Sequence, residues 1–309
     1  MNNQTLWKKS FRLFLLISFL SFFSSPRGTC QYRNMPRQTI PEKDKFSFIL
    51  VGDRTGSDSQ SWQIFDQAIG EINLLRPDFV IMIGDIIEEN PGRTTSIQSV
   101  WSEAVEHLKQ LEMPFFIIPG NHDIWDRTSY QTWNQLLGST YYSFSYKGCR
   151  FIILNSEESH ITGEIGFGEK QLAFLKEEIQ SHRQARQLFL FFHQPVWLPS
   201  EKDKYHWSEI ESLLDDTNYS VFAGHLHLLA SKQHQGHRYL IVGPTGGKMR
   251  LARNPNLGFM HHYTWVTVEN DSSYIAFIEP GKIYDEKLSQ NAYKRYLQGL
   301  YLLKGTNPY

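Results

Sequence analysis

Short apolar runs recur along the chain of 309 residues, and five of them stop at a side chain that can bind a metal ion. Stretches in which apolar residues repeat at helical spacing lie between the runs; Trp62, Phe65, Ile69 and Ile72 are one example. An order of strand, polar loop and helix is typical of an α/β domain with a largely parallel sheet. The five runs span residues 46–51, 79–83, 115–118, 187–192 and 219–223.

The remaining segments predict further elements but no internal repeat and no second domain. Helices are expected over residues 97–111, 169–182 and 207–214. Residues 141–146 and 150–154 are expected to form a hairpin that turns at Lys147-Gly148, and shorter strands follow over residues 239–242, 263–268 and 274–278.

The first 29 residues are expected to be a signal peptide. Lys8, Lys9 and Arg12 precede an apolar run over residues 13–23. Eleven residues rise only about 16 Å as a helix, too short for a hydrocarbon core about 30 Å thick. The pattern predicts export, so that the protein is periplasmic, secreted or membrane-anchored. Cys30 stands where the modified cysteine of a lipoprotein would lie, although the residues before it form a poor lipobox.

Composition excludes several kinds of site. The chain has 31 basic and 32 acidic side chains, so a surface for nucleic acid is not expected. Its two cysteines provide neither a disulfide framework nor a thiolate metal site, although Cys30 and Cys149 would be able to pair in an oxidising compartment. From these patterns we divide the chain into four parts. They are the signal peptide, a linker over residues 30–45, one domain over residues 46–280 and a C-terminal extension, residues 281–309, expected to be helical.

Oxygen and imidazole ligands stand where five predicted strands end. In α/β sheets, ligands bind beyond the carboxyl ends of the strands, so five separate loops can meet there. Carboxylates, imidazoles and an amide oxygen suit Mn²⁺, Fe or Zn²⁺ without a thiolate. An Asp after Gly is by itself ordinary turn chemistry, so only the joint order is strong evidence. The residues are Asp53, Asp85, Asn121 with His122, His193, and His225 with His227.

This series resembles the calcineurin-like metallophosphoesterase superfamily over roughly residues 46–278. The motifs that carry the resemblance are Gly52-Asp53, Gly84-Asp85, Gly120-Asn121-His122-Asp123, His193 and Gly224-His225-Leu226-His227. It implies an α/β fold, a four-layer αββα sandwich of two mixed sheets with the metal site at the carboxyl ends of the strands. It also implies hydrolysis of a phosphomonoester or phosphodiester, a small-molecule substrate, by a hydroxide that bridges two metal ions.

The resemblance further implies a role for each ligand. The metals would be two divalent ions or Fe(III) with a divalent ion, drawn from Mn, Fe or Zn. Asp85 would bridge both of them, Asp53 and His227 would complete one site, and Asn121, His193 and His225 would complete the other.

The same motif supplies the expected catalytic residues. His122 would not bind metal; it would face the scissile phosphate and assist the departing oxygen. Asn121 and His122 would both contact the substrate. Asp123 either orients the ring of His122 or caps a turn.

The first motif departs from the family pattern, which commonly has a histidine where Thr55 stands. Purple acid phosphatases also lack that histidine, but no tyrosine follows Asp85 in its loop as their pattern requires. The first site would then bind metal more loosely or prefer harder ions such as Mn²⁺. The Asp-Arg-Thr-Gly start resembles an exported bacterial subgroup, and Arg54 either binds a substrate phosphate or pairs with an acid in its loop.

The missing histidine alone supports a second hypothesis, a non-catalytic metal- or phosphate-binding member of the cell envelope. The retained His122, which has no metal to bind, argues against it.

Three further groups allow two interpretations each. The glycine-rich residues 245–248 with Arg250 form either a phosphate cradle or a structural turn. Trp125, Trp133 and Trp197 either line the cleft or belong to the core. His261 and His262 lie either at a sheet edge or in the core.

Overall fold

The computed structural model describes residues 44–56, 60–88, 96–163, 166–279, 282–284 and 286–304. The predicted signal peptide, Cys30 and residues 30–43 of the predicted linker lie outside them, so the predictions on export, lipid anchoring and a Cys30–Cys149 pair stay predictions. Cys149 is buried. Within the described residues, no helix combines the length and the apolar character needed to cross a bilayer.

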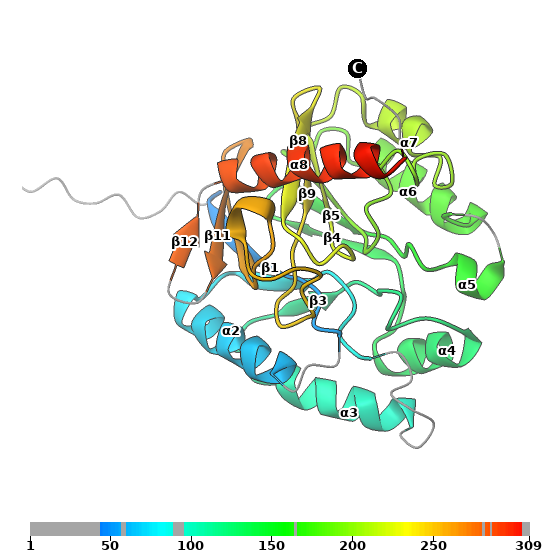
Figure 1. Ribbon diagram of the computed structural model, residues 1–309. Coiled ribbons are helices and arrows are strands. Elements are labelled where there is room, and N and C mark those ends of the chain that lie inside the picture. The colour runs from blue at the N-terminus through cyan, green and yellow to red at the C-terminus, as the bar shows by residue number, and fades with distance from the viewer. Residues whose placement is uncertain are drawn as a thin grey trace, which may run out of the picture. The chain divides into compact units, whose positions relative to one another are not determined.

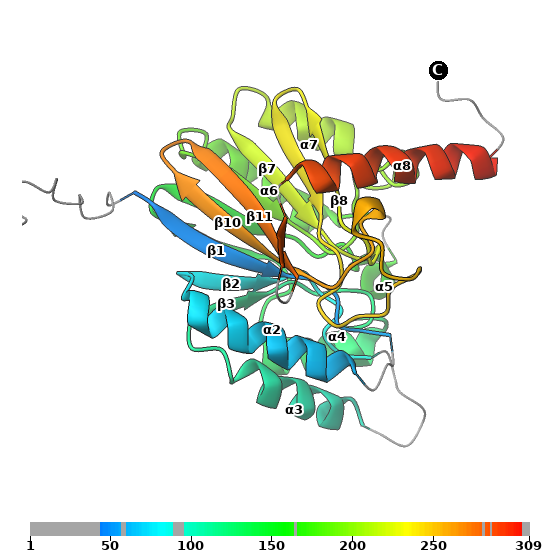
Figure 2. The same ribbon diagram turned by 60° about the vertical axis from the view of Figure 1, so that its left-hand side comes forward.

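The described strands form two six-stranded mixed sheets that face each other (Figures 1 and 2). One sheet has the order β12 (Lys282–Tyr284), β11 (Ser272–Glu279), β10 (Tyr263–Glu269), β1 (Phe46–Val51), β2 (Phe79–Met82), β3 (Phe115–Ile117). The other has the order β4 (Tyr142–Tyr146), β5 (Cys149–Ile153), β6 (Leu188–Phe191), β7 (Tyr219–Ala223), β9 (His237–Ile241), β8 (Ala230–His234). Strands β1–β2–β3 and β5–β6–β7–β9 are parallel, and the other pairs are antiparallel.

Helices cover the outer face of each sheet (Figure 2). On the first sheet lie α2 (Ser61–Leu75), α3 (Ile97–Leu108) and α4 (Arg127–Leu136), with the short α5 (Ser159–Thr162) beside α4. On the second lie α6 (Glu169–Ser181) and α7 (Trp207–Leu214), while α8 (Lys287–Lys304) packs on β8 and the 3₁₀ turn η1 (Pro255–Leu257). The predicted αββα sandwich of two mixed sheets is confirmed.

The central strands are largely buried on both faces, which explains their mostly apolar sequences. Aromatic rings fill the layer between the sheets: Phe151 lies edge-on to Phe48 with ring centroids 5.5 Å apart and stacks on Phe189 at 4.9 Å. Because this layer packs tightly, the two sheets hold their strand ends, and the loops that follow them, in fixed positions.

Several described elements, among them α4, α5, β8 and β12, are absent from the expectation. Helix α4 begins with a capping box between Asp126 and Ser129. Its sequence is mostly polar, so apolar periodicity alone does not predict it. Edge strand β8 pairs with β9 through a turn at Gln235-Gly236, where both residues have positive φ, and its polar residues give little strand signal.

Candidate metal centre

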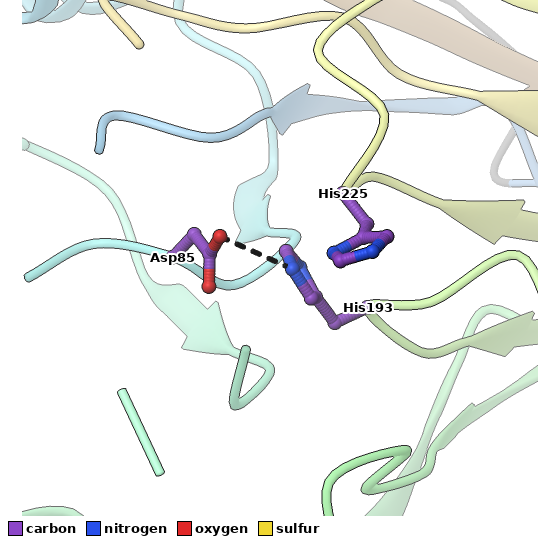
Figure 3. Close-up of side chains that lie close together, drawn as sticks. All are labelled: Asp85, His193 and His225. Atoms are coloured by element: carbon purple, nitrogen blue, oxygen red, sulfur yellow. Dashed lines mark ion pairs between the residues drawn. The ribbon is translucent and has the colours of Figure 1, made fainter. Parts of the chain in front are cut away.

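Four predicted ligands meet at the ends of β2, β3, β6 and β7. The ligand atoms of Asp85, His193 and His225 all lie within 4.8 Å of one another, and Figure 3 shows the three side chains converging. His193 Nε2 lies 3.3 Å from Asp85 Oδ2 and 3.2 Å from Asn121 Oδ1, which is in turn 2.9 Å from His225 Nδ1. These are the residues that the resemblance assigns to one metal ion.

A second group shares Asp85 with the first. The ligand atoms of Asp53, Asp85 and His227 also lie within 4.8 Å of one another, and His227 Nε2 is 3.6 Å from Asp53 Oδ1. Asp53 further accepts the backbone N–H of His225, at 3.0 Å from Oδ1, which ties the loop after β1 to the loop after β7. The structure thus places Asp85 between the two groups, where a bridging ligand would have to stand.

Backbone carbonyls fix which ring nitrogen of two histidines faces the centre. His193 Nδ1 lies 2.7 Å from the carbonyl of Ile83, and His227 Nδ1 lies 2.5 Å from that of Lys248. A carbonyl only accepts, so each Nδ1 carries the proton and each Nε2 lone pair is turned toward the site. Such partners orient metal-binding histidines and strengthen them as ligands.

Asp123 organises two of the ligand loops. Its side chain is fully buried, and Oδ2 accepts the backbone N–H of Asp85 at 2.7 Å and of Gly120 at 2.9 Å. Oδ1 accepts the N–H groups of Ile86 and Ile87 at 3.0 and 3.1 Å. Asp123 therefore caps its own turn, the second of the two predicted roles, and also holds the loop of Asp85.

The acids and histidines of the centre perturb one another strongly. Burial raises the pKa of Asp53 against the opposing charges of His193 and His227. Burial also acts to raise the pKa of Asp85, but His193 outweighs it and the pKa of Asp85 lies well below its usual range. The pKa of His193 is raised, because the attraction of Asp85 overcomes burial. Burial and the charge of His193 lower the pKa of His225 to about 3.

This donor set fits two cations. Two buried carboxylates, Asp53 and Asp85, lie among the imidazoles, and two cations would balance their negative charge while leaving the imidazoles neutral, as ligands must be. The set offers oxygen and imidazole nitrogen and no thiolate, which suits Mn²⁺, Fe or Zn²⁺.

Thr55, which differs from the family pattern, and its neighbour Arg54 are both buried beside the centre. Thr55 is buried, and its hydroxyl is 3.5 Å from Asp85 Oδ2. Arg54 is also buried; its Nε donates to the carbonyl of Ile86 at 2.5 Å and its guanidinium lies 4.0 Å from the ring centre of Trp62. With Glu88 3.9 Å away, Arg54 matches a loop charge paired with an acid rather than a ligand for phosphate.

His122 lies beside the two ligand groups without belonging to either. Its backbone N–H donates to Asp85 Oδ1 at 2.9 Å, and its side chain is half-buried at the edge of the centre. His122 thus adjoins the candidate ligand Asp85 and is partly exposed to solvent.

The other ambiguous groups are mainly structural. Thr245 and Gly247 donate their backbone N–H groups to the carbonyl of Asp53, so the glycine-rich residues form a turn that supports this loop. Trp133 and Trp197 are buried in the core, and Trp125 packs against it. His262 is buried, and His261 is half-buried.

One buried carboxylate near the centre has no counterpart in the sequence prediction. Glu157 follows β5 at the same edge of the sheet and accepts from Ser156 Oγ and Gln194 Nε2, both at 2.7 Å. Its charge helps to raise the pKa of His193. Its position in the sequence could have identified it, because Glu157 lies just beyond a predicted strand, as the candidate ligands do.

Comparison with known proteins agrees with this geometry. Residues 46–229 match the sequence model of the calcineurin-like phosphoesterases. The chain belongs to this family. Its members use two metal ions to hydrolyse phosphoric esters, so the chain is a hydrolase of phosphoric esters with a dinuclear metal centre.

Individual relatives and a solved structure add to this comparison. The chain is 28% identical over 222 residues to the serine/threonine-protein phosphatases CPPED1 of Pongo abelii and Homo sapiens, covering 64% of this chain and 68% of each of theirs. A dimetal phosphatase from Danio rerio superimposes with a TM-score of 0.56 at 16% identity, over 74% of this chain and 98% of that one. At that identity the likeness shows a shared fold.

Proposed function

We propose that the chain is a metal-dependent phosphomonoesterase in which His122 assists the leaving group. The observation that carries the proposal is the convergence of two ligand groups on the shared residue Asp85, with His122 beside them and half-exposed. The relatives named as phosphatases favour a phosphomonoester over a phosphodiester.

Each residue has a defined task in this reaction. The two groups around Asp85 would hold two metal ions, which would supply positive charge against the phosphoryl oxygens and acidify a water for attack on phosphorus. Asp85 offsets the repulsion between the two positive charges. As the bond from phosphorus to the leaving oxygen breaks, a protonated His122 donates its proton to that oxygen and becomes neutral. Asn121 orients the phosphoryl group.

The test is turnover by purified protein supplied with Mn²⁺. We expect release of p-nitrophenol from p-nitrophenyl phosphate, and slower release from bis-p-nitrophenyl phosphate. A folded protein that cleaves neither compound with Mn²⁺, Zn²⁺ or Fe²⁺ would contradict the proposal.

We further propose that the enzyme is exported and belongs to an exported bacterial subgroup of the family, on the evidence of the basic and apolar N-terminal residues. Fractionation of cells that produce the whole chain tests this: a protein retained in the cytoplasm at full length would contradict it.

A further inference from the structure

The loop that follows β9 brings a basic segment to the rim of the metal centre. The N–H of Lys248 donates to the carbonyl of Thr55 at 2.9 Å, and the carbonyl of Lys248 accepts from His227. Lys248 is therefore fixed against two of the site loops. Two further residues of chain reach at most about 7 Å between Cα atoms, so Arg250 is held near the centre as well.

The charge of Arg250 affects a residue of the metal centre and a residue of α8. The Arg250 residue is exposed, and its guanidinium contributes to the lowered pKa of His225 and opposes the raised pKa of Tyr296 on α8. Arg250 is thus an exposed cation on the loop that Lys248 fixes against the site.

Two other arginines of this region are already engaged. Arg253 pairs with Glu279, and Arg54 is buried beneath Trp62. Arg250, by contrast, makes no hydrogen bond or ion pair with any of the residues that the structure describes. Its guanidinium is a cation whose planar donors match a carboxylate or a phosphate group.

We infer that Arg250 binds a second anionic group of the substrate, next to the phosphoryl group held at the metal centre. The inference rests on the proposed function and names its substrate class: phosphomonoesters that carry a carboxylate or another phosphate a few bonds from phosphorus. A contact at an exposed guanidinium is expected to strengthen binding about three- to tenfold.

Matched phosphonates test this contact without turnover, because their carbon–phosphorus bond is not an ester. The probes are carboxyalkylphosphonates with one, two or three methylene groups, each compared with the uncharged alkylphosphonate of equal length. Affinities for the full chain in Mn²⁺ are measured by isothermal titration calorimetry. Arg250→Gln removes the charge at the rim, Arg250→Lys keeps it without the planar fork, and Arg253→Gln removes a charge from the same loop.

We expect wild type to bind at least one carboxylated probe about three- to tenfold more tightly than its uncharged partner. Arg250→Gln should bring this ratio close to one, Arg250→Lys should retain part of it, and Arg253→Gln should leave it as in wild type. Equal binding of both probes by wild type, or no binding at all, overturns the inference. So does a ratio that Arg250→Gln preserves or that both glutamine variants lower alike.

The proposed function is judged separately. Hydrolysis of p-nitrophenyl phosphate without a preference for carboxylated probes supports the enzyme and refutes the role of Arg250. A preference that depends on Arg250, without turnover of any ester, supports the anion contact and refutes the proposed phosphomonoesterase.

Discussion

Replacing Asp123 by asparagine should destabilise the protein by removing acceptors from buried backbone N–H groups. The carboxylate accepts four backbone N–H groups, two at each oxygen. The amide keeps one oxygen and turns an NH₂ group toward the other two donors. Each buried donor without an acceptor costs about 1–3 kcal/mol, so two give about 2–6 kcal/mol.

An opposing effect places the expected value in the lower half of that range. Burial and the adjacent charge of Asp85 raise the pKa of Asp123 to about 7, which shows that its ionised form is held at some cost. The neutral amide removes this cost. We therefore expect Asp123→Asn to lower the free energy of unfolding by about 2–4 kcal/mol, which is large against a typical total of about 5–15 kcal/mol.

Urea denaturation of the metal-free protein measures this change directly. Asp126→Asn is the matched control: it makes the same chemical change three residues further on, where Asp126 caps α4 by accepting from the N–H of Ser129. Asparagine caps helices about as well as aspartate, so the control should stay within about 0.5 kcal/mol of wild type. If the two variants are equally stable, the four hydrogen bonds of Asp123 do not hold the loops as described.

Three further outcomes follow from the same contacts. His122→Ala should keep its metal content and lose about 10²- to 10⁴-fold in turnover, whereas His225→Ala should lose metal; elemental analysis beside the p-nitrophenyl phosphate assay checks both, and equal loss of metal would contradict the division of roles. Gly247→Ala should lower the free energy of unfolding by about 1–3 kcal/mol, because the added Cβ would lie 2.6 Å from the carbonyl oxygen of Asp53. Gly70→Ala on α2, where a Cβ would have nothing within 4 Å, should raise it by about 0.5–1 kcal/mol. Urea denaturation of both variants measures these changes. Chelation of the metals should lower the thermal midpoint of wild type, and His225→Ala should show a smaller drop in a calorimetric scan.

The central strands and their order along the chain are predictable, because burial on both faces requires mostly apolar residues. A strand covered on both faces is mostly apolar, so the runs at residues 46–51 and 219–223, each with a single serine, match β1 and β7 in full. Exposed edge strands and short capped helices carry no such constraint. This is why β8 and α4 are missing from the prediction, although the capping pair Asp126 and Ser129 marked the start of α4.

The candidate ligands can be named from the sequence as residue types, but their supports cannot. The side chains of Asp85 and His193 must supply particular atoms, so their identity is visible in the sequence. The carbonyls of Ile83 and Lys248, which orient His193 and His227, belong to the backbone and leave no trace in residue identity. The sequence of residues 245–248 left both a phosphate cradle and a structural turn open, and in the fold these residues form a turn that supports the loop of Asp53.

The backbone conformation of this centre is a feature that the sequence does not reveal. Asp85, His225 and His227 all have positive φ, at 55°, 70° and 52°, a region that non-glycine residues enter at a cost of about 1–3 kcal/mol each. Such angles persist only where the surroundings enforce them. Here Asp123 accepts hydrogen bonds from the loop of Asp85, and the carbonyl of Lys248 accepts one from the ring of His227. The strain and the metal geometry thus have one cause, so weakening these supports should impair metal binding even though no ligand is changed.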